Sequence, residues 1–330
     1  MLYLLLRRML ATIVTLALIS VVAFVLIELP PGDFVDSYAG KKIQGGAIIT
    51  PEELAVMRTN LGLDRPVYIQ YFKWMGALAH GDMGFSWEFR RPVKDVLAER
   101  LPLTLILAFT TLFFTYMIAV PMGIYSAVRQ YSIGDHITTI SGYIGLAMPQ
   151  FVFALILIYL GHLWFGISVG GIFSPEFEGL PWSFAKFVDM LKHIWIPVLV
   201  LGTAGTAFQM RTMRAVLLDE LNKMYVISAR ASGLSEFRLL VKYPIRMALN
   251  PIVSTLGWEL SNIVSGAPII GLVLSLPDTG PLFINALLNQ DMYLAGAMIL
   301  IYCTLVIIGT FLSDILLVIM DPRIRVGGAA

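Results

Sequence analysis

Polar side chains inside apolar segments are the residues of this 330-residue chain whose types and positions could carry chemistry. Glu259 and Asn262 lie one helical turn apart in an apolar run, and an ionisable residue at that depth is a functional candidate. Packing or an interhelical hydrogen bond is the competing interpretation. His80 and Asp82 could serve metal or proton chemistry, but no third ligand follows at a recognisable spacing, so we expect them to bond backbone groups of a turn.

Enzyme motifs are missing from the sequence. It contains no phosphate-binding G-x-x-x-x-G-K-[ST] loop, no H-E-x-x-H and no G-x-S-x-G. The histidines are scattered without metal-ligand spacing at His80, His136, His162 and His193. The single cysteine, Cys303, excludes a disulfide framework within the chain. We therefore expect no catalytic residue, no metal site and no cofactor bound by this chain.

The composition is that of an integral membrane protein. Hydrophobic residues make up 58% of the chain and charged residues 14%, with a mean hydropathy of +0.79. A soluble domain carries about 25% charged residues. The net charge of +1 gives no case for nucleic-acid binding.

Six apolar runs are long enough to cross a bilayer, and they predict an all-α membrane protein with six transmembrane helices. The runs are Met9–Leu29, Leu101–Val128, Ile137–Phe165, His193–Val216, Met247–Leu274 and Tyr293–Met320. The first is longer than a signal-peptide core and ends in the breaker cluster 30–33, so we expect it to be retained. Pro149 and Pro197 can kink their spans.

A mostly polar loop, residues 30–100, separates the first two runs. Thr50 followed by Pro51 and two glutamates predicts the start of a helix. The aromatic, amphipathic stretch 67–78 suits a helix packed at the membrane interface.

Lysine and arginine in the short loops set the predicted orientation. With the N-terminus inside, the inside segments hold Arg7, Arg8, Arg129, the dense set between Arg211 and Arg246, Arg323 and Arg325. The outside segment 166–192 has only Lys186 and Lys192, and segment 275–292 has neither residue type. Both termini are therefore expected in the cytoplasm.

A polar, basic island at 225–246 interrupts the apolar segments on the inside. Small residues before Gly233 would allow another surface to approach closely. Ser235 is a predicted N-cap, and Pro244 is predicted to kink or end the helix that follows Ser235. Arg238, Lys242 and Arg246 recur every four positions and would share one helix face. We expect a short helix, a glycine break and a second amphipathic helix, which as such could be a plain interfacial connector.

Several segments carry a family resemblance. The island resembles the conserved cytoplasmic loop of ABC-importer permeases, and the whole chain resembles the permease subunits of oligopeptide, dipeptide and nickel importers. The matching segments are Ser228-Ala-Arg-Ala-Ser-Gly233 with Asn250-Pro251, Arg7-Arg8 with Leu29-Pro-Pro-Gly-Asp33, Leu61-Gly-Leu-Asp-Arg-Pro66 with Gln70-Tyr71, Gly81-Asp-Met-Gly84 with Arg91-Pro-Val93 and Glu99-Arg-Leu-Pro102, and Asp321-Pro-Arg-Ile-Arg325.

This resemblance implies the ABC type I importer permease fold in the bacterial cytoplasmic (inner) membrane. The implied domains are an N-terminal helix and long extracytoplasmic loop at 1–95, a five-helix domain at 96–320 with a coupling loop at 217–246, and a cytoplasmic tail at 321–330. A coupling helix that docks on an ATPase subunit would comprise Tyr225, Ser228, Ala229, Arg230, Ala231, Ser232, Gly233 and Leu234. The implied partners are a second homologous permease, two ATP-binding subunits that hold ATP and Mg²⁺, an extracytoplasmic solute-binding protein, and membrane lipid.

One region departs from the family pattern. After the fifth span the family commonly shows a Glu, a Phe and Pro-Gly-Leu-Gly, whereas this chain has Gly271, Leu274 and Pro277-Asp-Thr-Gly280. Because the family's translocation path or outer gate lies there, Asp278 joins Glu259 and Asn262 as a candidate for that path. An oligopeptide or dipeptide is the expected solute, with opines, oligosaccharides and nickel complexes as alternatives.

A function of another class is also open. An ATP-independent secondary transporter or channel would show inverted repeats and discontinuous spans with paired polar residues. We find no convincing repeat between the halves. A membrane enzyme is a third interpretation, which lacks catalytic groups.

Overall fold

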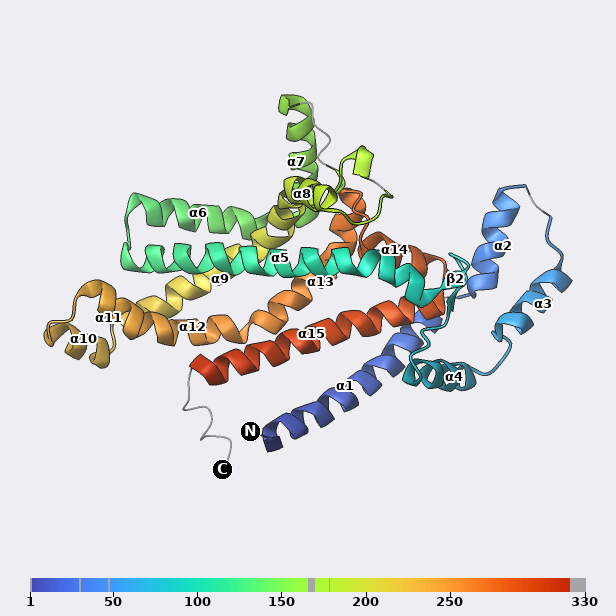
Figure 1. Ribbon diagram of the computed structural model, residues 1–330, viewed down its shortest axis with the longest axis horizontal. Coiled ribbons are helices and arrows are strands. Elements are labelled where there is room, and N and C mark those ends of the chain that lie inside the picture. Colours follow the sequence, from blue (N-terminus) through green and yellow to red (C-terminus); the bar gives the residue numbers. More distant parts are fainter. Residues whose placement is uncertain (1, 30, 47, 166–169, 178, 321–330) are drawn as a thin grey trace. The chain divides into compact units, whose positions relative to one another are not determined.

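A computed structural model describes residues 2–29, 31–46, 48–165, 170–177 and 179–320, and these residues form an almost entirely helical chain (Figure 1). The chain packs as two compact units. Unit 1 comprises Met1–Thr104 and Asp278–Leu305, and unit 2 comprises Leu105–Pro277 and Val306–Ala330. The segment 321–325 of the family pattern and the expected tail lie outside the described residues.

The helices and strands follow one another in two sets. Unit 1 contains α1 (Leu2–Glu28), α2 (Phe34–Gln44), α3 (Pro51–Leu61), α4 (Val67–Ala79), the antiparallel strands β1 (Phe85–Ser86) and β2 (Arg91–Pro92), and α14 (Thr279–Leu288). Unit 2 contains α6 (Ile133–Ala147), α7 (Gln150–Phe165), the 3₁₀ turn η1 (Pro175–Phe177), α8 (Phe184–His193), α9 (Trp195–Leu221), α10 (Met224–Ala231), α11 (Glu236–Lys242), α12 (Pro244–Ser254) and α13 (Leu256–Val273). Two long helices, α5 (Val93–Val128) and α15 (Met292–Met320), contribute to both units.

The membrane-spanning character of the chain is confirmed, but the count of six spans is not. Among the described residues, α1, α5, α13 and α15 are long and apolar enough to cross a membrane, and α6 with α7 makes a fifth span if the bent pair is one. The expected fourth span corresponds to α9, which is long enough but carries Gln209, Arg211 and Arg214. Because α9 packs against α6, α7, α12 and α13, it can be less apolar than a helix that faces lipid all round.

Two expected spans are broken. A bend of 105° separates α6 from α7 at Pro149, as its sequence position suggested, since proline cannot donate the helical hydrogen bond. The run 247–274 divides at Thr255 into α12 and α13. Pro197, by contrast, lies in the first turn of α9, where no helical hydrogen bond is lost.

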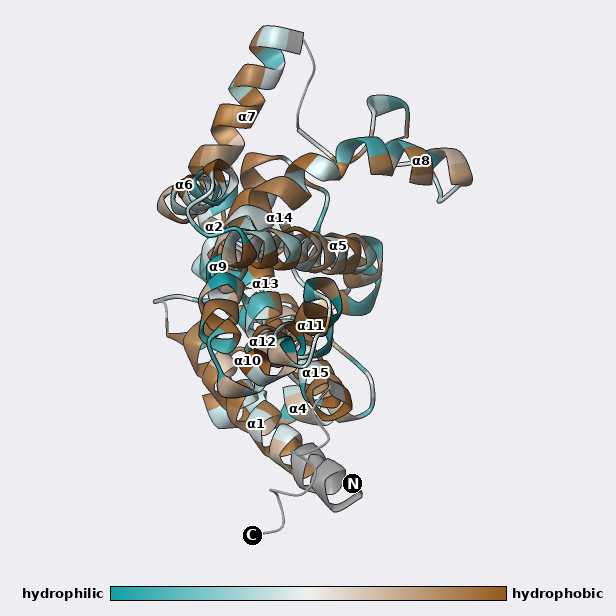
Figure 2. Cartoon of the chain, turned by 90° about the vertical axis from the view of Figure 1, so that its left-hand side faces the viewer, coloured by the Kyte–Doolittle hydropathy of each residue, from teal (hydrophilic) through white to brown (hydrophobic). Residues whose placement is uncertain are grey.

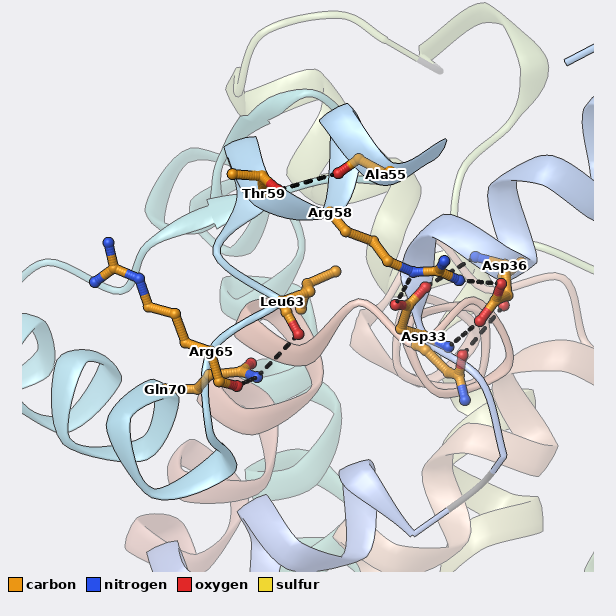
Figure 3. Close-up of polar contacts among 10 residues, drawn as sticks. Asp33, Asp36, Ala55, Arg58, Thr59, Leu63, Arg65 and Gln70 are labelled. Carbon is orange, nitrogen blue, oxygen red and sulfur yellow. Dashed lines mark hydrogen bonds and ion pairs between the residues drawn. The ribbon is translucent and has the colours of Figure 1, made fainter. Parts of the chain in front are cut away.

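The long loop of unit 1 is folded rather than extended. Thr50 caps α3 through a reciprocal capping box with Glu53, which confirms the predicted helix start. Arg58 of α3 bonds both Asp33, at 2.7 Å, and Asp36, so that α3 is held against the start of α2 (Figure 3). Gln70 donates to the carbonyl of Arg65 at 2.9 Å, which fixes the turn into α4.

Aromatic rings form the core of unit 1. Trp74 of α4 is 1% exposed and stacks on Phe24 of α1 with centroids 5.8 Å apart. Its ring also lies so close to Gly296 of α15 that a Cβ there would come within 2.6 Å of it. The predicted amphipathic helix at 67–78 is therefore present, and its tryptophan points inward.

Candidate functional site

The basic island of unit 2 folds as two short helices around a glycine. α10 ends at Ala231, Gly233 adopts φ +81°, and α11 begins at Glu236. Glycine reaches this left-handed conformation without the Cβ penalty of other residues. The predicted helix–glycine–helix arrangement is confirmed, as is the end of the second helix before Pro244, which starts α12.

Contacts at both ends fix this arrangement, which we name the α10–α11 turn (residues 224–242). Glu220, at the end of α9, accepts hydrogen bonds from the Tyr225 hydroxyl and from Lys223 Nζ. Arg230 donates from Nε and Nη2 to the two carboxylate oxygens of Glu236, at 2.7 and 3.3 Å, across the glycine. A doubled, charge-assisted contact of this kind fixes direction as well as distance.

The α10–α11 turn has both buried and exposed apolar side chains. Val226 and Leu239 are fully buried and anchor the two helices. Four other apolar side chains of the turn are exposed to solvent: Met224 at 73%, Phe237 at 77%, Ile227 and Val241. These exposed apolar side chains on a polar, basic segment are available for contact with another surface.

Two details of the island differ from expectation. Arg238 and Lys242 lie in α11, whereas Arg246 lies beyond Pro244 in α12, so the three side chains do not share one helix face. The proline divides the segment into two helices and breaks the four-residue repeat. Ser235 occupies the N-cap position of α11, but its side chain makes no capping hydrogen bond.

A buried ion pair ties three helices together before the α10–α11 turn. Arg214 of α9 donates from Nε and Nη2 to the carboxylate of Asp135 in α6, both at 3.0 Å. Ser126, near the end of α5, donates to the same carboxylate, and the backbone N–H of Tyr131 donates to it at 2.9 Å. Sequence reasoning missed this group, because its members lie far apart in the chain. A hollow of about 630 Å³ lies beside it, lined by residues 127–132 and by Leu218, Leu221 and Asn222.

The candidate path residues lie in different surroundings. Glu259 of α13 is 2% exposed, and its Oε2 has no hydrogen-bond partner among the described residues. Its carboxylate approaches Gly205 of α9 so closely that a Cβ there would overlap it. Asn262 is exposed, although it lies only one turn further along α13. The two residues are therefore not a buried pair.

Asp278 belongs to unit 1, where it caps α14. Its Oδ1 accepts the N–H of Gly280 at 3.1 Å, its Oδ2 has no partner in the described part of the chain, and the side chain is 2% exposed. Burial raises the pKa of this carboxyl to about 7, against the weaker opposite effect of the Gly280 N–H. The neighbouring Thr279 bonds Thr104 and Tyr302, each at 2.8 Å.

The described residues contain no group of three or more histidine, cysteine, aspartate or glutamate side chains that could hold a metal ion. His80 Nδ1 lies 2.8 Å from the Gly76 carbonyl, and Asp82 accepts the N–H of Gly84 at 2.8 Å. The expectation that both residues bond backbone groups is confirmed.

Family comparisons decide what kind of chain this is. Residues 119–326 match the family described as "Binding-protein-dependent transport system inner membrane component". The chain belongs to this family. Residues 1–108 match the corresponding N-terminal family. A family of transport permeases is not catalytic, so the interpretations as an enzyme, an independent channel or a secondary transporter are set aside. The chain is a multi-pass component of the inner membrane.

This chain matches known relatives over nearly its full length. It is 34% identical to "Oligopeptide transport system permease protein AppB" of Bacillus subtilis, over 97% of this chain and 98% of the relative. It is 30% identical to "Dipeptide transport system permease protein DppB" of Escherichia coli, over 98% of this chain and 99% of the relative. A chain of the MetNI methionine ABC transporter, solved in inward-facing conformations, matches with a TM-score of 0.53 and 16% identity, covering 68% of this chain and 96% of that one. This last match supports the permease fold alone.

Proposed function

We propose that the chain is the translocating permease of an ATP-driven importer for oligopeptides or dipeptides, and that the segment from Tyr225 to Leu234 couples it to an ATPase subunit. The observation that carries the coupling role is the exposed apolar surface of the α10–α11 turn. Its two helices are fixed by Glu220 and by the Arg230–Glu236 pair. A displacement of the turn would therefore be transmitted to α9 and would not only deform the turn itself.

The residues of the coupling segment have separate tasks in this proposal. Ile227, together with Met224 just before the segment, supplies apolar contact, and Gly233 makes the turn that brings α11 back. The side chains of Ser228, Ala229, Ala231 and Ser232 are small, so a partner can approach the backbone closely. Tyr225 and Arg230 hold the turn through Glu220 and Glu236, and Leu234 follows the glycine.

The partners follow from the same reasoning. Because the sequence lacks a phosphate-binding loop, ATP and Mg²⁺ would be held by two separate ATP-binding subunits. A second, homologous permease would complete the path, and an extracytoplasmic binding protein would deliver the solute. Both termini would lie in the cytoplasm, with the domain layout 1–95, 96–320 and 321–330. Glu259, Asn262 and Asp278 would serve the path.

A substitution series at Gly233 tests the coupling role. A Cβ at this position meets no atom of the described residues within 4 Å, so an added side chain starts in open space. Gly233→Trp is expected to abolish ATP-driven uptake in proteoliposomes of the complete transporter, while the protein still inserts and the complex is purified. Gly233→Asn is the matched control and should retain uptake, since asparagine tolerates the left-handed conformation. Normal uptake by the tryptophan variant would contradict the assignment.

The solute is tested on the binding protein. Peptide is proposed because the relatives that match over nearly the whole chain are named for oligopeptide and dipeptide transport. We expect the cognate binding protein to bind di- and oligopeptides in a calorimetric screen that also contains opines, oligosaccharides and nickel complexes. Binding of one of these other classes alone would overturn the peptide assignment and leave the coupling role untouched.

A further inference from the structure

The amphipathic helix α8 departs from the usual arrangement in water, because two of its charged side chains, Lys186 and Asp189, are buried while three of its large apolar side chains are exposed. Lys186 and Asp189 are each 7% exposed. Phe184 is 82% exposed, Leu191 52% exposed and Phe187 44% exposed. The function proposed above makes no use of this helix.

The buried charged groups of Lys186 and Asp189 have hydrogen-bond partners within the same segment, which compensates for their burial. Lys186 Nζ donates to the Leu180 carbonyl at 2.5 Å and lies 4.6 Å from the centre of the Phe173 ring. Asp189 accepts both the N–H and the hydroxyl of Ser174, each at 2.7 Å. These contacts hold Phe173, Ser174 and Leu180 against α8 and fix which face of the helix turns outward.

The outward apolar residues form a continuous stripe. Phe184, Phe187 and Leu191 recur at intervals of three and four residues within α8. Trp182, just before the N-cap residue Ser183, and Trp195, at the start of α9, are each 54% exposed. Side chains at this spacing share one helix face. Aromatic residues of this kind are enriched where a protein meets the boundary between water and the bilayer.

The place of α8 in unit 2 agrees with such a boundary. The backbone N–H of Gly171 donates to the carbonyl of Leu274 at 2.7 Å, which ties the segment before α8 to the end of the membrane-spanning helix α13. At its other end α8 leads through Ile194 into α9. In Figure 1 α8 is seen nearly end-on while α5 runs across the view, and in Figure 2 α8 is seen lengthways. The helix thus lies crosswise to α5, at the level where α13 ends.

We propose that α8 lies in the plane of the membrane surface, with the stripe Phe184, Phe187 and Leu191 inserted at the boundary between lipid headgroups and acyl chains. Helices of this type bury their apolar face about 5–10 Å into that boundary. Lys192, exposed beside the stripe, is placed to meet anionic headgroups. The helix anchors the connection between α7 and α9 to the bilayer whatever solute the transporter carries.

Spin labels measure which environment the stripe meets. In a Cys303→Ser background, Phe184→Cys, Phe187→Cys and Leu191→Cys are labelled one at a time in the complete transporter. The complex is reconstituted in vesicles of phosphatidylethanolamine and phosphatidylglycerol. Collision with oxygen reports lipid, and collision with a water-soluble nickel chelate reports water. Glu176→Cys, at an exposed acidic position of the same segment, is the aqueous reference, and Leu18→Cys in α1 is the lipid reference.

The expected result is an oxygen-to-nickel collision ratio at all three stripe positions that is severalfold higher than at Glu176 and close to that at Leu18. A ratio like that of Glu176 would place the stripe in water and overturn the proposal. Low collision rates with both reagents would show that a protein covers the stripe, either the second permease or the binding protein, and would overturn it as well. Three separately labelled positions keep the test valid if one variant fails to insert. Because no uptake is measured, the outcome is independent of the proposed peptide transport.

Discussion

Arg230 and Glu236 are joined across the Gly233 turn by two hydrogen bonds, at 2.7 Å and 3.3 Å, and both side chains remain about half exposed. An exposed pair of this kind contributes less than about 1 kcal/mol to stability. Its geometry nevertheless sets the direction of α10 against α11. The pair therefore matters more for the shape of the turn than for the stability of the chain.

Reversing these two charges separates shape from stability. Arg230→Glu and Glu236→Arg should each lower ATP-driven uptake several-fold with little change in thermal unfolding, since like charges would push the two helices apart. The double variant restores the pair in the opposite sense and should recover part of the uptake. Uptake that stays low in the double variant would mean that the partner subunit contacts the Arg230 side chain directly.

The buried Asp135–Arg214 pair is expected to behave differently. The side chain of Asp135 is 3% exposed and that of Arg214 29% exposed. Arg214→Met would leave a buried carboxylate without its cation, at a cost of about 3–5 kcal/mol. Asp135→Leu combined with Arg214→Met removes both charges and should be less destabilising than Arg214→Met alone. Thermal unfolding of the purified variants in detergent gives the order, and a double variant less stable than the single one would contradict this account.

Close packing of Trp74 on α15 gives a third prediction. A Cβ at Gly296 would lie 2.6 Å from the Trp74 ring, so Gly296→Ala should lower stability by about 1–3 kcal/mol through overpacking. Gly76→Ala is the matched control, because Gly76 lies in α4 with no atom of the described residues within 4 Å of an added Cβ. The control should be neutral or raise stability by up to about 1 kcal/mol. Equal destabilisation by both changes would show that Trp74 packing is not the cause.

Features that depend on nearby residues could be predicted from the sequence. The Thr50 cap and the glycine break of the island follow from neighbouring side chains and were found as expected. Long apolar runs likewise predicted α1, α5 and α15, whereas the run 247–274 was expected as one span and contains α13 as its second part only.

Features that depend on residues far apart in the chain could not be predicted from the sequence. The partner of Asp135 lies 79 residues away in the chain, and no periodicity indicates it. The polarity of α9 reflects its burial among other helices, and only the fold shows that Lys186 and Asp189 of α8 turn inward. Sequence alone would place such charges on a solvated face. The α10–α11 turn was located correctly, but the hydrogen bonds that Tyr225 and Lys223 donate to Glu220 were not predicted.

The buried carboxyl of Asp278 predicts a pH dependence of stability. Its pKa is about 7 in the folded chain, against an ordinary value of 3.8 for the unfolded chain. Below pH ~4 both states hold the proton, and between about pH 4 and 7 only the folded state holds it, so stability falls as the pH rises through this window. From about pH 5 to 8 the loss amounts to about 2–3 kcal/mol. Asp278→Asn keeps an oxygen for the Gly280 N–H but cannot ionise.

The midpoint of thermal unfolding should therefore drop between about pH 5 and 8 more in the natural protein than in Asp278→Asn, and the variant should be the more stable of the two at the upper end of this range. Comparing the two proteins cancels the titration of all other groups. Glu99→Gln is a control at an exposed carboxylate that bonds Arg91, and it should leave the slope over this window unchanged. Parallel pH profiles for the natural protein and Asp278→Asn would show that Asp278 is ionised throughout the window, and hence that water or Arg100 reaches its free oxygen.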